Sequence, residues 1–233
     1  MNSKGMTSDR RTAKVAGTLF IVATLASILS LPFLGSISAS DYLVSVSANA
    51  NQVTTGVFLA FVAAIASACI AISLYPILRR YSQGLALGAV GFRLIEGVFY
   101  IVGVLGLVLL LTLSQQFVSA GAPNASYFQT LGALLLAGYH WAGNVGSLLA
   151  FSLGAMMYYY IFYKTRLVPR WLSSWGLVGA ALCTVAGTLV LFNVVGPLST
   201  TQVVLALPIA VQEMVLAVWL IAKGFNQYPL GSA

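Results

Sequence analysis

The chain alternates between long hydrophobic runs and short polar segments, and this alternation predicts its architecture. Six runs are apolar almost throughout, and each holds about 20 residues or more, enough for an α-helix to cross the hydrocarbon core of a bilayer. They occupy residues 15–34, 54–78, 85–113, 131–163, 172–192 and 202–222. We therefore predict an all-α membrane protein, a bundle of six transmembrane helices in one domain over residues 15–225. A short segment, 1–14, precedes this domain, and a tail, 226–233, follows it.

The lengths of the first and fourth runs determine how each is interpreted. The first could be read as a cleaved signal peptide with Arg10 and Arg11 as its charged region. The hydrophobic part of a signal peptide has about 7–15 residues, so this longer run is better interpreted as a membrane span. The fourth run is too long for one perpendicular crossing. We expect either that its first turns project beyond the bilayer or that the helix tilts.

Composition and charge agree with a membrane protein and predict its orientation. Hydrophobic residues make up 60% of the chain and charged residues 6%, whereas about a quarter of a soluble domain is charged. The net charge of +7 does not indicate nucleic acid binding, because the basic residues form short clusters between apolar runs. Apart from Arg93, they all fall in segments that lie on one side of a six-span bundle: Lys4, Arg10, Arg11, Lys14, Arg79, Arg80, Lys164, Arg166, Arg170 and Lys223. The positive-inside rule then predicts a multi-pass protein of the cytoplasmic membrane with both termini in the cytoplasm.

The most informative residues are the charged ones inside the runs. Arg93 and Glu96 lie three residues apart in the third run, so they share a helix face and can pair. Counted at about 1.5 Å per residue, Arg93 and Glu213 of the sixth run lie at the same depth, roughly 15 Å from the basic side. We predict a bridge in which Arg93 joins both carboxylates. One cation and two anions leave an excess negative charge, which is costly in a low dielectric. A retained proton, a cation or a cationic ligand would balance it.

Further polar residues lie in the fourth run. His140 and Asn144 are four apart on one helix face and are expected in the half of the membrane away from the basic clusters. We interpret His140 as a hydrogen-bonding residue, because its depth does not match that of the two glutamates as a metal site would require. Tyr158, Tyr159 and Tyr160 precede Lys164 and are interpreted as an aromatic belt at the membrane interface. We predict neither a metal nor a cofactor, since no Cys/His metal spacing, P-loop or dinucleotide motif occurs.

Several short motifs together resemble an uncharacterised prokaryotic membrane-protein family, domain of unknown function 4386. They are residues 74–79 (LYPILR), 91–96 (GFRLIE), the region around His140, 167–172 (LVPRWL), 212–214 (QEM) and 219–225 (WLIAKGF). The resemblance covers nearly the whole chain. It implies an integral membrane protein and no established activity.

Three classes of function remain open at this point. The first is a small transporter or permease-like protein that moves an unknown small molecule or protons, with Arg93, Glu96, Glu213, His140 and Asn144 as binding or relay residues. The second is a membrane-embedded enzyme acting on a lipid or isoprenoid, with Glu96 or His140 as general base. The third is a structural or regulatory membrane protein whose ion pairs only hold the bundle together. An open aqueous path to Glu96 would favour transport. A closed lipid-facing cleft would favour an enzyme, and full packing would favour a structural role.

Overall fold

The computed structural model describes residues 3–121 and 125–226, and among these it contains helices and no strands. Six helical segments are long and apolar enough to cross a membrane, so the predicted all-α membrane fold is confirmed. They are α1 (Ser3–Phe33), α3 (Ala50–Leu78), α4 (Gln83–Ser119), the continuous run α5 (Ala125–Gly138), η2 (Tyr139–Gly146) and α6 (Ser147–Thr165), α7 (Arg170–Leu191), and α8 (Thr200–Ala222). Residues 1–2 of the N-terminal segment, 122–124 of a loop and 227–233 of the tail lie outside the described residues.

Several helices extend beyond the hydrophobic runs of the sequence. The loop predicted after the first run is therefore shorter than expected. Residues 35–53, between the first two hydrophobic runs, are predicted from their polarity to form a loop. The structure instead contains a short 3₁₀ turn, η1 (Gly35–Ser38), a helix, α2 (Tyr42–Ala48), and the start of α3. The physical reason is tertiary packing. Leu43 and Val46 lie one turn apart on α2 and are buried in an apolar cluster with Leu107 and Leu110 of α4. This burial stabilises α2 as a helix, which its serine- and alanine-rich sequence does not predict by itself.

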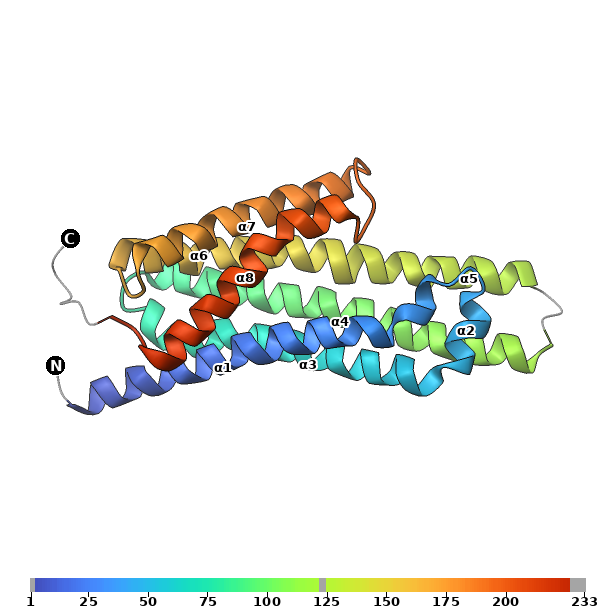
Figure 1. The fold of residues 1–233 in the computed structure, drawn as a ribbon, viewed down its shortest axis with the longest axis horizontal. Helices are drawn as coiled ribbons and strands as arrows, with labels where there is room; N and C mark the ends of the chain where they lie inside the picture. Colours follow the sequence, from blue (N-terminus) through green and yellow to red (C-terminus); the bar gives the residue numbers. More distant parts are fainter. Residues whose placement is uncertain (1–2, 122–124, 227–233) are drawn as a thin grey trace.

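The six long segments close into a ring. Each packs mainly against its neighbours along the chain, in the order α1, α3, α4, α6, α7 and α8, and α8 then packs against α1. Figure 1 shows α8 crossing α1 obliquely, while α4 and α5 extend past the turn between α7 and α8. Since α4 and α8 are not neighbours in this order, any interaction between them must cross the lumen of the ring.

Two apolar clusters fill the two ends of the ring. One joins all six segments in the half that holds the chain ends, and includes Phe20, Leu74 and Leu216. The other lies in the opposite half among α2, α3 and α4, and includes Val53 and Leu107. The charged residues Arg93, Glu96 and Glu213 belong to neither cluster. They form a polar layer that borders the larger cluster, which on α8 includes residues on both sides of Glu213, Ile209 and Leu216.

The described chain ends lie at one end of the molecule (Figure 1), which we call the basic end. There Arg80 makes two 2.8 Å hydrogen bonds to the carboxylate of Asp9, and this hydrogen-bonded carboxylate raises the pKa of Arg80. Arg10 donates to the carbonyl oxygen of Ala222 at 2.8 Å, a C-terminal carbonyl of α8 that its own helix leaves without a partner. Polar contacts therefore tie α1 to the α3–α4 turn and to the end of α8. The opposite end, with α2, α5 and the α7–α8 turn, is called the loop end.

A close approach of backbones sets the position of the fourth segment. A Cβ atom on Gly103 of α4 would lie 2.7 Å from the Cα atom of Gly143 in η2 and 2.9 Å from its nitrogen. Small residues allow such crossings in membrane bundles, where helices associate through tight van der Waals packing. Gly103 and Gly143 therefore fix how near η2 comes to α4.

We expect Gly103→Ala to destabilise the bundle by about 1–3 kcal/mol, because the added methyl group meets backbone that cannot rotate away. Gly91→Ala, on the same helix, is the matched control, since nothing lies within 4 Å of its added Cβ. Thermal unfolding of both variants in detergent measures the difference. Equal melting temperatures for the two variants would contradict the close crossing.

Candidate functional site

The centre of the polar layer is an ion pair within α4. The guanidinium Nη1 of Arg93 donates to Glu96 Oε2 at 2.9 Å, one helical turn away. Arg93 is 1% exposed and Glu96 9% exposed. A charge in the hydrocarbon region costs several kcal/mol unless it is paired, and the spacing of three residues supplies the partner from the same helix.

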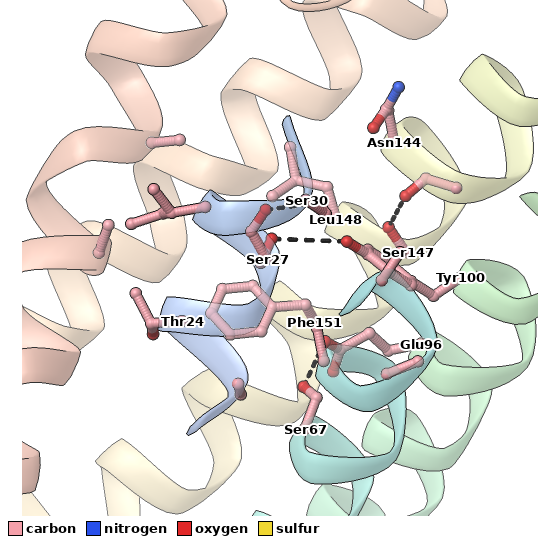
Figure 2. Close-up of a pocket in the computed structure, with 18 of the residues that line it drawn as sticks. Thr24, Ser27, Ser30, Ser67, Glu96, Tyr100, Asn144, Ser147, Leu148 and Phe151 are labelled. Carbon is pink, nitrogen blue, oxygen red and sulfur yellow. Dashed lines mark hydrogen bonds between the residues drawn. The ribbon is translucent and has the colours of Figure 1, made fainter. Parts of the chain in front are cut away.

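Glu96 is held by a second helix as well. Its other oxygen, Oε1, accepts a 2.6 Å hydrogen bond from the hydroxyl of Ser67 on α3, as Figure 2 shows. Both carboxylate oxygens therefore have a short hydrogen bond, one of them to a charged donor, which is the stronger kind. Glu96 is fixed in place between α3 and α4.

Glu213 reaches the same site from the other side of the lumen. Its Oε1 lies 3.9 Å from Nη2 of Arg93 and accepts a hydrogen bond from the hydroxyl of Tyr158 at 3.4 Å. Arg93 thus meets a carboxylate from each side, which is the arrangement expected from the depths of the two helices. Both contacts of Glu213 are longer than those of Glu96, so Glu213 is the more loosely held carboxylate.

Aromatic rings enclose the cation of this site. The guanidinium carbon of Arg93 lies 4.8 Å from the centre of the Phe151 ring and 5.9 Å from that of Tyr158. These distances are those of cation–π contacts. The side chain of Arg93 is only 2% exposed, and its Nε has no hydrogen-bond partner among the described residues.

The interpretation of Tyr158 and Tyr159 as an interfacial belt is wrong. Both side chains are completely buried, and the Tyr159 hydroxyl donates to Gln212 Oε1 at 2.5 Å. The amide nitrogen of Gln212 donates in turn to the carbonyl oxygen of Leu172 at 3.0 Å. Their rings point inward because α6 is surrounded by α4 and α7 in the ring, whereas Tyr160 remains exposed. The chain of bonds ties α8 to α6 and α7 directly beside Glu213.

A cavity of about 380 Å³ lies in the lumen next to this site. Its lining comes from all six long segments, and it extends from Glu96 and Glu213 toward Leu31 and Leu198 near the loop end. The walls are mostly apolar, with a few hydroxyl groups. One of these, Ser27 of α1, lies 3.4 Å from the Tyr100 hydroxyl of α4 (Figure 2). An apolar cavity with a few convergent polar groups is the usual form of a ligand site.

His140 and Asn144 are both in η2, a stretch of π-helix. Their side chains lie side by side, with Asn144 Nδ2 3.1 Å from His140 Nδ1. Asn144 lines the cavity on its loop-end side, whereas His140 is not part of the lining. Stretches of π-helix often occur at functional sites. The structure therefore brings Asn144, but not His140, to the cavity that ends on the carboxylates.

The described residues give no cluster of metal ligands. No group of three or more His, Cys, Asp and Glu residues among them could hold a metal ion. Cys69 and Cys183 are free thiols, and Cys183 is buried in the wall of the cavity. The chemistry within reach is that of a guanidinium, two carboxylates and several hydroxyl groups, which suits binding and proton exchange.

One protein-family model matches most of the chain. The family described as a domain of unknown function (DUF4386) matches residues 15–224. The chain belongs to the DUF4386 family. This confirms the resemblance drawn from the sequence motifs. Comparison with curated proteins and with solved structures finds no match, so the family comes with no activity to transfer, and the site has to be interpreted from its own geometry.

Sequence reasoning missed several residues that build the site in this member of the DUF4386 family. Ser67, Tyr100 and Phe151 belong to apolar runs and carry no signal that separates them from ordinary core residues. Gln212 had a usable signal, because an amide next to Glu213 in the middle of a span must find hydrogen-bond partners. The buried tyrosines were missed because their nearness to Lys164 suggested an interface.

The two carboxylates are expected to differ in their contribution to stability. Removing one partner of a buried ion pair costs about 3–5 kcal/mol, although single hydrogen bonds in membranes average near 0.6 kcal/mol. We expect Glu96→Gln, which disturbs two short bonds, to be more destabilising than Glu213→Gln. Arg93→Met should be the most destabilising of the three.

A double-mutant cycle of Arg93→Met and Glu213→Gln in bilayer discs measures whether they interact. Their effects on unfolding free energy should be non-additive by roughly 1 kcal/mol, the range for residues in one network. Strict additivity would mean that Arg93 and Glu213 do not interact across the lumen.

Proposed function

We propose that the protein is a small membrane transporter in which a solute and a proton share the site formed by Arg93, Glu96 and Glu213. The observation that carries this proposal is the cavity, because it ends on the two carboxylates. Glu96 and Glu213 keep 11% and 12% of their side-chain surface exposed, whereas Arg93 keeps 2%. Ion pairs that only hold helices together need no cavity beside them.

The charge of the site supports exchange. Two carboxylates and one guanidinium leave one excess negative charge, and such a charge is costly in a medium of low dielectric constant. A proton or a cation lowers that cost, and the two compete for the same charge. Competition of this kind couples the movement of a solute to that of a proton.

The packing of the ring supports access to the site from the loop-end side and not through the basic end. Below the site, toward the basic end, Leu74, Tyr158 and Leu216 are fully buried in the larger cluster. Above it, the cavity extends toward the loop end. The positive-inside rule predicts that the basic end faces the cytoplasm, so we assign this arrangement to the outward-facing state of the proposed transporter. Transport requires a second state in which the ties of Arg10 and Arg80 at the basic end are released.

Proteoliposomes that contain a pH-sensitive dye test the proposal. Organic cations, carboxylates, sugars and neutral amphiphiles are added outside in turn, and the internal pH is recorded. At least one class should change the internal pH in vesicles with the protein and not in empty vesicles. Glu213→Gln should abolish this change, while Asp41→Asn, an acid-to-amide change at an exposed residue, should preserve it. If no class acts on folded wild-type protein, proton-coupled transport is refuted.

A further inference from the structure

We propose that the cavity binds a monovalent organic cation with an apolar body, such as an amine or a quaternary ammonium ion. This inference rests on the proposed function for its place in transport, and it names the class of substrate. As a statement about binding it can be tested without any transport. Three features of the cavity carry it: the charge that its lining exposes, its aromatic groups, and its size.

The first feature is the sign of the exposed charge. Arg93, the cation of the site, also lines the cavity, but Phe151 and Tyr158 cover it and its side chain is only 2% exposed. The side chains of Glu96 and Glu213 are more exposed, at 11% and 12%. A molecule in the cavity therefore meets carboxylate oxygen more readily than guanidinium nitrogen. Glu213 is also the loosely held carboxylate, with its two contacts at 3.4 and 3.9 Å, so it is the one available to a ligand.

The second feature is the aromatic part of the lining. Tyr100 and Phe151 line the cavity close to the carboxylate end, and Tyr139 lines it nearer the loop end. Aromatic faces attract cations, and aromatic groups recognise quaternary ammonium ligands in particular. Phe151 already makes such a contact with Arg93 at 4.8 Å. Carboxylates together with aromatic rings favour a cation over an anion or a neutral solute.

The third feature is the size and polarity of the remaining wall. Alanine residues of α3 and α8, among them Ala63 and Ala206, leave room for a ligand. A volume of about 380 Å³ lies at the small end of the range of ligand pockets, about 300–1,000 Å³. An apolar body of modest size would fill it. The single excess negative charge matches one positive charge, so a polyvalent cation would leave charge unbalanced.

Binding of such a cation should compete with protons. The charged and titratable groups around Glu213 are Arg93 and Glu96 on α4, Tyr158 and Tyr159 on α6, and Cys183 on α7. Among these, the two carboxylates are the groups that become neutral on protonation in acid. Once a carboxylate is protonated, the excess negative charge is lost and the attraction for a cation falls. A permanently charged ligand separates this effect from its own titration.

Benzyltrimethylammonium is a suitable probe because its charge does not depend on pH. Neopentylbenzene has nearly the same shape without the charge, and phenylacetate carries the opposite charge. Each is titrated into wild-type protein in phosphatidylcholine nanodiscs, and binding is followed by calorimetry and by the rise in melting temperature. We expect benzyltrimethylammonium to bind at least about tenfold more tightly than the other two, with weaker binding as the pH falls. Equal or tighter binding of neopentylbenzene or phenylacetate would overturn the proposal.

Substitutions of Glu213 test whether this residue binds the cation. Glu213→Gln should weaken benzyltrimethylammonium binding about tenfold or more and reduce its pH dependence, whereas Glu213→Asp should restore part of the affinity. Asp41→Asn is the control and should bind like wild type. Unchanged binding by a folded Glu213→Gln variant would overturn the proposal. Proton movement in proteoliposomes is measured separately from binding. A protein that moves protons with a solute of another class, but does not bind this cation, would refute the substrate class and leave the proposed transport intact.

Discussion

A guanidinium placed in the middle of a helix ring is the interaction on which this structure depends. Arg93 lies on α4, and its partners come from α4 itself, from α6 and from α8 on the far side of the lumen. A charge at this depth in a bilayer is tolerated only with partners or water. The helices that supply those partners must therefore remain around it, and the pairing of Arg93 constrains how α4, α6 and α8 are arranged.

The two apolar clusters explain how the ring can be stable and still contain a cavity. The larger cluster joins all six helical segments at the basic end, where polar ties from Asp9 and Arg10 add to it. The smaller cluster holds the loop end through α2, α3 and α4. Neither cluster fills the lumen between Glu213 and Leu198, where the cavity lies. The packing at both ends leaves a cavity beside the polar layer without loosening the bundle.

The sequence predicted the charged centre of the site well, for local reasons. Three residues of spacing place Glu96 beside Arg93, and counting along straight helices places Glu213 at the same depth. It did not predict the order of the ring, because hydrophobic periodicity does not specify neighbours in lipid. For that reason the hydrogen bond from Ser67 and the inward position of Tyr158 were missed. The helix α2 was missed for a related reason, since two apolar residues one turn apart reveal a helix only when their partners on α4 are known.

The central claim is that the site is reached from the loop end and closed toward the basic end. Two alanines of α8 test it directly. Ala210 lines the cavity three residues before Glu213, and Ala217 is fully buried four residues after it. Each is replaced by cysteine in a Cys69→Ala, Cys183→Ala background and treated in intact cells with a membrane-impermeant, positively charged methanethiosulfonate. The account predicts that Ala210→Cys reacts and Ala217→Cys does not, and that a negatively charged reagent of the same type reacts more slowly. If Ala210→Cys is as unreactive as Ala217→Cys, or if both react equally, the site is not a one-sided cavity and the account is contradicted.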